Sequence, residues 1–336
     1  MKKMIAAAAA AITLAGASIV PAQAQGKGET VRLQDYPGIG NLLFRVAIAK
    51  GFCEQHGITC RLQIIPSGAL GAQALLARSI DVAVVGPESQ ILAMLKGANL
   101  AALMSVATAN PFQIVVRNEA GVPEVGQDYR AVMTGLKGRK IGVPARGAVG
   151  ELQFGQLAQR AGLKPEDFVY VAVGGPNTAY GALVSKQVDA LMTFEPAGSI
   201  CEVMKNCRTV FRAARATEPV EVAGTNGASV IAVMTRDAAD RAPHVVDALI
   251  AAGRDAAGFL QDPKNFDETL RIAQSYFRFD IPRGDEVMAE SLRAGIPSYR
   301  VEVSRPALKQ IADNMLLTKQ IDAPFDTSKL LHAKAP

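Results

Sequence analysis

Two segments of the chain carry the same order of hydrophobic and polar residues about a hundred positions apart. Residues 77–90 (ARSIDVAVVGPESQ) and 184–198 (VSKQVDALMTFEPAG) each place a valine or isoleucine and an aspartate before a short apolar run. The runs over 82–85 and 190–194 do not alternate with polar residues, which is typical of parallel strands covered on both faces. A strand, a glycine-containing turn and an amphipathic helix are predicted before each run. We therefore expect two βαβ lobes, with chance self-resemblance of an α/β sequence as the alternative.

The pattern around the first repeat extends the alternation of strands and helices. Tyr36 to Gly40 (YPGIG) has the composition of a turn, and the helix after it ends at Gly51. Residues 111–118 (PFQIVVRN) then form a predicted strand that leaves the first lobe. The other predicted strands are residues 30–34, 58–65 and 100–108, and the predicted helices are residues 41–52 and 90–96.

The second lobe is expected to begin with a helical turn at Gly135 and Leu136. A strand over 228–237 returns the chain to the first lobe, and the remaining residues are mostly helical, with amphipathic stretches over 265–277 and 307–317. The prediction is an α/β chain of two lobes joined by two connecting strands, with a helical C-terminal third. The predicted ranges are a strand over 140–144, a Gly-rich loop over 145–151, a helix over 152–161 and a strand over 168–173. The expected lobe 1 is residues 25–116 and 232–336, and the expected lobe 2 is residues 117–231.

The first 24 residues have the pattern of an export signal. Lys2 and Lys3 precede an apolar run over 5–20, and small residues at Ala22 and Ala24 form a cleavage site. A membrane anchor is the alternative, but the apolar run is too short to span a bilayer. A lipoprotein signal would need a cysteine in place of Ala17. We therefore expect a periplasmic protein, exported through a cleavable signal and without a lipid anchor.

Composition narrows the class of partner. The chain has 336 residues and a formal net charge of +5, and its length suits two domains. Its basic residues are dispersed, and the densest cluster, Lys137, Arg139 and Lys140, has no interleaved aromatic residues. Nucleic-acid binding would require a concentrated basic face or a stacking platform, so we do not expect it.

Four cysteines occur in two local pairs, Cys53 with Cys60 and Cys201 with Cys207. Four cysteines allow three pairings, and the sequence does not choose between them. Export favours disulfides over free thiols, and the spacings do not fit a shared zinc site. Our hypothesis is that each local pair is bridged.

Motifs for catalysis and for metal binding are not found in the sequence. His56, His244 and His332 are isolated, and no neighbouring residues provide metal-ligand spacing. The chain has no G-x-S-x-G elbow, no phosphate-binding P-loop and no H-E-x-x-H helix. We expect neither catalytic activity nor a metal or other cofactor.

Several segments, in this order and spacing, resemble the solute-binding proteins of ABC importers, of the nitrate, sulfonate and taurine type. These proteins are related to the binders of thiamine-pyrimidine precursors. The resemblance implies a monomer with a small-molecule ligand and a permease as partners. An enzyme of the related pyrimidine-precursor synthase fold is the alternative, but the cysteine-rich segment and active-site histidine of those enzymes are not found here. The segments are residues 49–58 (AKGFCEQHGI), 74–89, 137–147 and 182–196.

In such a fold, ligands bind outside the carboxyl ends of strands from both lobes. For Ser67 and Ser89, helix N-capping and ligand contact are equal alternatives, since a helix N-terminus at the cleft allows both. Glu88 and Glu195 are expected either as salt-bridged hinge residues or as partners of a cationic ligand group. The site residues expected from lobe 1 are Tyr36, Pro37, Asn41, Ser67, Gly68, Pro87, Glu88, Ser89, Thr108, Ala109 and Asn110. Those expected from lobe 2 are Arg146, Gly147, Ala148, Val149, Asn177, Thr178, Phe194, Glu195 and Asn226.

The chemistry of these positions favours an anionic ligand. Helix N-termini and the guanidinium of Arg146 attract negative charge. Few aromatic residues are available in the chain, which argues weakly against a large planar ligand. We expect a small organic anion, a sulfonate or a carboxylate, and the alternative is a neutral heterocyclic or aromatic solute.

Overall fold

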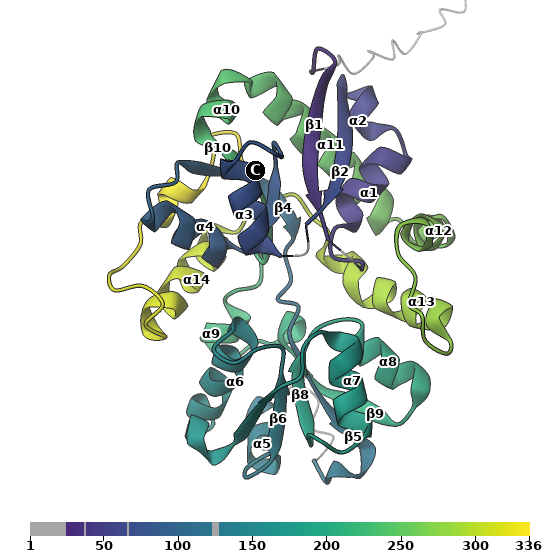
Figure 1. The fold of residues 1–336 in the computed structure, drawn as a ribbon, viewed down its shortest axis with the longest axis vertical. Helices are drawn as coiled ribbons and strands as arrows, with labels where there is room; N and C mark the ends of the chain where they lie inside the picture. The colour runs from purple at the N-terminus through teal and green to yellow at the C-terminus, as the bar shows by residue number, and fades with distance from the viewer. Residues whose placement is uncertain (1–24, 37, 66, 123–127) are drawn as a thin grey trace, which may run out of the picture.

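The computed structural model describes residues 25–36, 38–65, 67–122 and 128–336. The predicted export signal and the predicted site residue Pro37 lie outside these described residues. Two lobes lie one above the other in Figure 1, and two segments of the chain run between them. The upper lobe holds the N-terminal strands and most of the C-terminal helices, so the chain leaves its first lobe and returns to it, as the hydrophobic pattern predicts.

The strands of the first lobe form a two-stranded and a three-stranded sheet. In the smaller sheet β1 and β2 are parallel, and in the larger sheet β10 lies between β3 and β4 and is antiparallel to both. A parallel bridge between Leu33 and Val82 joins β1 to the residues just before β3. The strands are β1 (Glu29–Asp35), β2 (Ile58–Ile64), β3 (Ala83–Val85), β4 (Leu100–Ala107) and β10 (Val230–Thr235).

The core of the first lobe gathers around α11, because apolar side chains recur along this helix at spacings that keep them on one side. Val246, Leu249 and Leu260 of α11 belong to the same buried cluster as Leu33 and Val84 of the sheets. The helices of this lobe are α1 (Leu42–Ala49), α2 (Phe52–Gln55), α3 (Gly68–Leu76), α4 (Pro87–Leu95), α10 (Arg236–Arg241), α11 (Pro243–Gln261), α12 (Phe266–Tyr276), α13 (Gly284–Gly295) and α14 (Arg305–Leu317).

The second lobe is built on a five-stranded sheet in the order β7-β6-β8-β5-β9. β6 is parallel to β7 and to β8, whereas β5 is antiparallel to β8 and to β9. The strands are β5 (Gln113–Arg117), β6 (Lys140–Val143), β7 (Val169–Ala172), β8 (Ala190–Thr193) and β9 (Cys207–Arg212). The helices are α5 (Tyr129–Gly135), α6 (Val149–Arg160), α7 (Pro176–Val184), α8 (Ala197–Met204) and α9 (Val220–Ala223).

The chain crosses between the lobes at the start of each predicted connecting strand, rather than along it. β5 forms ladders with β8 and β9, so residues 113–116 belong to the second lobe and not to the first. β10 is paired on both edges within the first lobe, from Val230 onward. The crossings are therefore the short segments before Gln113 and before Val230. The backbone N–H and C=O groups of a strand form hydrogen bonds with its neighbours in the sheet. A strand therefore belongs to the lobe that contains these neighbours.

The two lobes contact each other on both sides of the crossings. On one side α13 packs against α8, and Arg283, just before α13, donates a hydrogen bond to the carbonyl of Val203 (Figure 1). On the other side α14 contacts α9, where Asn314 donates to the carbonyl of Glu221 at 2.6 Å. Ile200 of α8 is part of the main core of the first lobe. These contacts join the lobes at two flanks.

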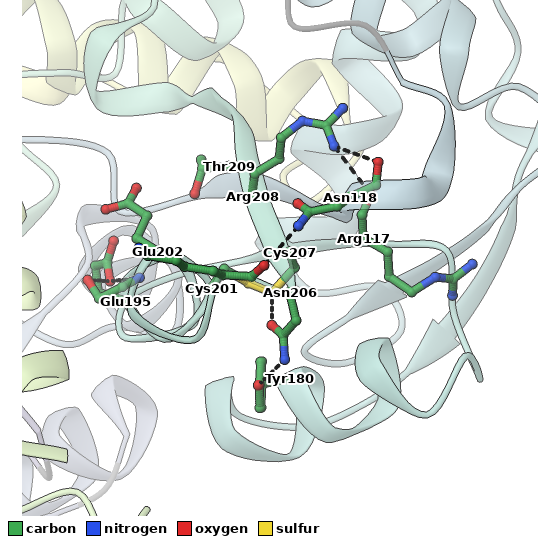
Figure 2. Close-up of a disulfide and its surroundings, with 12 residues drawn as sticks. Arg117, Asn118, Tyr180, Glu195, Cys201, Glu202, Asn206, Cys207, Arg208 and Thr209 are labelled. Atoms are coloured by element: carbon green, nitrogen blue, oxygen red, sulfur yellow. Dashed lines mark hydrogen bonds between the residues drawn. A yellow bond between two sulfur atoms is a disulfide. The ribbon is translucent and has the colours of Figure 1, made fainter. Parts of the chain in front are cut away.

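Both predicted disulfides are present, Cys53–Cys60 and Cys201–Cys207. Figure 2 shows the second one, which joins α8 to the first residue of β9. Next to it, Asn206 donates to the hydroxyl of Tyr180 at 2.7 Å. The bridge and its neighbours therefore fix the start of the strand whose other end reaches the space between the lobes.

Candidate ligand-binding cavity

A cavity of about 610 Å³ lies between the two lobes. Its walls come from the loop after β1, the ends of β4 and β10 and the segments around α13 in the first lobe. In the second lobe they come from the start of β5, the N-terminus of α7 and the ends of β8 and β9. Of the predicted site residues, those that line the cavity are Tyr36, Ala109, Asn110, Asn177, Thr178, Phe194 and Glu195.

A buried ion pair shapes the first-lobe wall. Arg45 of α1 pairs with Asp35 at the end of β1 at 3.0 Å, and both side chains are less than 5% exposed. The same guanidinium donates hydrogen bonds to the carbonyls of Tyr36 and Gly38, in the loop that lines the cavity. A buried pair of this kind is tolerated because the additional hydrogen bonds compensate for lost hydration. The sequence signal for this arrangement is an arginine within the apolar helical run of α1, and Arg45 is not among the predicted site residues.

A second buried group, Gln34 of β1, ties three segments together behind this wall. Its amide donates to the carbonyls of Ile65 and Ser67 and accepts from the backbone of Val84, each at 2.9–3.0 Å. Gly71 leaves the space that Gln34 occupies, since a Cβ at Gly71 would lie 1.8 Å from the amide oxygen. Any larger residue at this position would break the junction.

Two tyrosines of the cavity wall donate their hydroxyl protons to the backbone of the first lobe. Tyr36 donates to the carbonyl of Val84, and Tyr299 donates to that of Ile39 at 2.6 Å. Burial raises the pKa of Tyr36 to about 12 and also raises the pKa of Tyr299. Both rings are therefore neutral at physiological pH, and they present mostly apolar surface to the cavity.

Glu195, predicted either as a salt-bridged residue or as a ligand contact, is ion-paired. Its carboxylate accepts hydrogen bonds from Arg212 at 2.9 Å, Gln113 at 3.1 Å and the Ser199 hydroxyl at 2.6 Å. Arg212 also pairs with Glu202. The positive charge of Arg212 is therefore balanced by carboxylates of its own lobe, which leaves it little capacity to attract an anionic ligand.

Arg215 is a cavity residue that the sequence analysis missed. It ends the short 3-10 helix Ala213–Arg215 after β9, it is exposed, and it lines the cavity. Within the part of the chain that the structure describes, its guanidinium makes no hydrogen bond or ion pair. Asn177 is exposed at the N-terminal turn of α7, while Thr178 donates to the carbonyl of Gly175 at 2.8 Å. A cation and a polar helix start thus face the same space.

The segment Arg146, Gly147, Ala148 and Val149 does not line this cavity, contrary to the expectation. Arg146 pairs with Glu151 at 2.8 Å, and the same carboxylate accepts the backbone N–H of Gly147 at 3.0 Å. The anion expected at the start of α6 is therefore supplied by the helix itself. The sequence showed the Gly-rich loop but not that Glu151 folds back over it.

The remaining predicted residues among those that the structure describes do not line the cavity. Ser67 caps α3, since its hydroxyl accepts the N–H of Leu70 at 3.2 Å. Glu88 and Val149 line a small separate recess between α4, α6 and α14, and burial raises the pKa of the Glu88 carboxyl. The others that do not line it are Asn41, Ser67, Gly68, Pro87, Ser89, Thr108 and Asn226.

Aromatic rings cover much of the cavity wall. Phe112 and Phe194 of the second lobe pack edge to face, with ring centroids 6.2 Å apart. Phe277 and Phe279 of the first lobe do the same at 5.0 Å. The chain has 12 phenylalanines and 6 tyrosines, and the rings at the cavity are Tyr36, Phe112, Phe194, Phe277, Phe279 and Tyr299. The low aromatic content of the whole chain therefore gave no indication that several of its rings gather at this cavity.

The described residues contain no group of three or more His, Cys, Asp or Glu side chains placed to hold a metal ion. Each histidine contacts one carboxylate: His56 with Asp255, His244 with Glu29 and His332 with Asp240. No helix among the described residues has both the length and the apolar character needed to cross a membrane.

Two α/β lobes with a ligand-sized cavity between them define the fold of the periplasmic binding proteins. The periplasmic aliphatic sulphonate binding protein SsuA from Escherichia coli matches 91% of this chain and 98% of its own, with a TM-score of 0.72 and 17% identity. The periplasmic nitrate-binding protein NrtA from Synechocystis PCC 6803 matches 73% of this chain and 66% of its own, with a TM-score of 0.57 and 17% identity. At this level of identity the likeness shows the fold.

The chain belongs to the NMT1/THI5-like family, whose model matches residues 42–265. A Brucella abortus protein named as a binding protein is 31% identical over 157 residues, which are 47% of this chain and 45% of the relative. The matched region thus spans about half the length of these curated relatives. These findings confirm the predicted family resemblance, and they agree with a binding protein rather than an enzyme.

Proposed function

We propose that the protein is an extracytoplasmic solute-binding protein that captures a small organic anion, a sulfonate or a carboxylate, between its lobes. It then delivers the solute to the membrane permease of an ABC importer. It acts as a monomer in the periplasm after removal of residues 1–24. Family membership and the two-lobed fold support the transport role.

The observation that carries the proposal is the charge balance of the cavity wall. Arg212 and Glu195 neutralise each other, whereas Arg215 contacts no carboxylate among the described residues. A cation with no partner among the described residues, at a mostly apolar wall, favours a ligand that brings one negative charge. The guanidinium geometry suits a sulfonate or carboxylate, each of which offers two oxygens to a bidentate contact.

The size of the cavity favours an organic anion over an inorganic one. A volume of about 610 Å³ falls within the range typical of sites for organic small molecules. An inorganic anion such as nitrate would fill little of it and would leave the apolar wall in contact with water. The hydrophobic contribution to binding scales with the apolar area that is covered, so an organic body gains affinity that a bare anion lacks.

Calorimetric titration of the mature protein tests the proposal. Ethanesulfonate, benzenesulfonate, benzoate and nitrate would be compared with the neutral benzamide at the same ionic strength. We expect at least one organic anion to bind and to raise the melting temperature with its concentration, and nitrate and benzamide to bind much more weakly. Equal affinity for benzoate and benzamide would contradict the anion preference.

A further inference from the structure

We propose that the body of the solute is an aromatic ring, so that the ligand is an arene sulfonate or an arene carboxylate. This inference rests on the proposed function and narrows it to one ligand class. It is carried by two edge-to-face phenylalanine pairs at the cavity, one from each lobe.

The pair of the second lobe is placed by the sheet. Phe112 directly precedes β5 and Phe194 directly follows β8, and these strands are antiparallel neighbours in which Gln113 is opposite Thr193. The two rings therefore lie at the same sheet edge, at 88° to each other. Since both rings are only partly buried, part of each remains available to the cavity.

The pair of the first lobe comes from the segment between α12 and α13. Phe277 and Phe279 are two residues apart in an extended stretch, and their rings meet at 82°. Phe279 is 8% exposed and belongs to the main core, which anchors the pair. Tyr36 and Tyr299 extend the same aromatic wall, and their hydroxyl protons are already donated to the backbone.

Such a wall selects for ring chemistry. Aromatic rings attract one another through their quadrupoles in offset or edge-to-face geometry, in addition to the effect of buried area. A planar ligand ring can contact a ring face on one lobe and a ring edge on the other. A saturated ring of similar size gains the buried area but not the quadrupole contacts.

The ring would be oriented by the positive charge of Arg215 in the cavity wall. Arg215 and the polar start of α7 belong to the second lobe, on the same side as Phe112 and Phe194. An anionic group bound there directs its aromatic body toward the phenylalanine pairs. A ligand with one anionic group on an aromatic ring therefore matches both the cationic part of the wall and its phenylalanine pairs.

Matched ligand pairs on the wild-type protein give the direct test. Benzenesulfonate and benzoate would be titrated beside cyclohexanesulfonate and cyclohexanecarboxylate, which keep the charge and approximate size but remove the aromatic electrons. We expect the aromatic member of each pair to bind about three- to tenfold more tightly, as expected for aromatic contacts of ordinary strength. Ethanesulfonate should bind more weakly than benzenesulfonate.

The outcomes separate this inference from the proposed function. If cyclohexanesulfonate binds as tightly as benzenesulfonate, the ring inference is wrong and the organic-anion function stands. If benzamide binds as tightly as benzoate, the ring inference survives and the anion preference fails. If no member of the panel binds, both are overturned.

A variant series tests the named side chains. Phe194→Leu and Phe277→Leu should each weaken benzenesulfonate binding by about three- to tenfold and should change ethanesulfonate binding less than twofold. Phe259→Leu is the matched control, because Phe259 is also partly buried and edge to face, with Phe52, but does not line the cavity. Equal losses for both ligands would contradict a specific role for the rings, and the wild-type ligand panel decides the inference even if a variant fails to fold.

Discussion

Three arginines of the second lobe differ in what their guanidinium groups contact. Arg146 pairs with Glu151, and Arg212 pairs with Glu195 and Glu202. Arg215 makes no such contact within the described residues and lines the cavity. A guanidinium that is already paired with a carboxylate contributes less to the binding of an anionic ligand. At the scale of single residues, an arginine therefore indicates an anion site only if its charge is not already balanced.

The Arg215→Ala variant should therefore lose affinity for the anionic ligand. Removing one charge-assisted hydrogen bond costs about 1.5–3 kcal/mol, which corresponds to roughly a tenfold to hundredfold rise in Kd. Folding should be unaffected, because Arg215 is exposed. Titration of benzenesulfonate into wild type and variant measures the change.

Arg146→Ala is the matched control for this experiment, since it removes another exposed arginine of the same lobe. We expect the Kd of benzenesulfonate to stay within about twofold of wild type, because the Arg146 side chain is exposed and lies outside the cavity. A large loss with Arg146→Ala and none with Arg215→Ala would reverse the assignment.

Glu88 gives a prediction for the pH dependence of stability. Burial raises the pKa of its carboxyl, and the recess around it holds Gln153, Gln156 and Asn314 but no other charged side chain. A raised pKa means that the folded state binds the proton more tightly than the unfolded state. At neutral pH the charged Glu88 therefore lowers the free energy of unfolding, and this penalty disappears as the pH falls through the raised pKa.

Glu88→Gln should accordingly stabilise the protein at pH 7 by about 1 kcal/mol, and the gain should vanish at acidic pH. Urea unfolding at several pH values measures it. Glu302→Gln, at an exposed position, is the control and should change stability little at any pH. A Glu88→Gln variant that is less stable at pH 7 would show that the charged form is favoured in the folded state.

Sequence reasoning at the residue scale identified positions near strand ends but not their pairings. Phe194 was predicted because it ends the second repeated strand and Asn177 because it opens a helix, and both line the cavity. Arg215, Phe277 and Phe279 were missed because they lie outside the repeated βαβ pattern, in segments whose course depends on tertiary packing. The sequence shows where a strand ends, but not which distant loop meets it.

At the scale of elements, hydrophobic periodicity predicted most strands and helices. The buried runs of β3 and β8 were identified from their unbroken apolar residues, and both are buried in sheets. The expected parallel pairing holds for β8 with β6, whereas the ladder of β3 with β10 is antiparallel. The limits differed where capping decides them: α4 begins at Pro87 rather than at residue 90, since proline suits the first helical turn. The sequence did not predict to which lobe β5 belongs, because its partners β8 and β9 lie far from it in the sequence.

The disulfide between α8 and β9 leads to a prediction at this scale. Replacing Cys201 and Cys207 by serine should lower the free energy of unfolding by about 2 kcal/mol, because a short loop is released in the unfolded chain. It should also weaken binding of benzenesulfonate, since β9 leads to Arg212 and Arg215. Chemical unfolding and titration of the double variant measure the two effects.

The Cys53–Cys60 bridge offers the comparison for that experiment. It joins α2 to β2 in the first lobe, and neither cysteine lines the cavity. The Cys53→Ser, Cys60→Ser double variant should lose similar stability but keep its affinity for benzenesulfonate. Equal losses of affinity in both double variants would mean that the second bridge has no specific role in positioning the arginines.

At the scale of the whole molecule, the cavity is built by two lobes that the chain joins through short crossings. A ligand that touches both walls stabilises the arrangement in which they face each other. We expect the radius of gyration from small-angle scattering to decrease when benzenesulfonate saturates the protein, and not when non-binding nitrate is added at the same ionic strength. An unchanged radius at saturation would indicate that the lobes are already fixed.

The interlobe contacts of α13 with α8 and of α14 with α9 have a kinetic consequence. Once the lobes have closed on a solute, as predicted above, the solute leaves only when they separate again. Its release rate then has an upper limit, the frequency of lobe opening, which belongs to the protein and not to the solute. Solutes of different chemistry would share this maximum release rate. The same opening frequency would limit how often one protein molecule can release a bound solute.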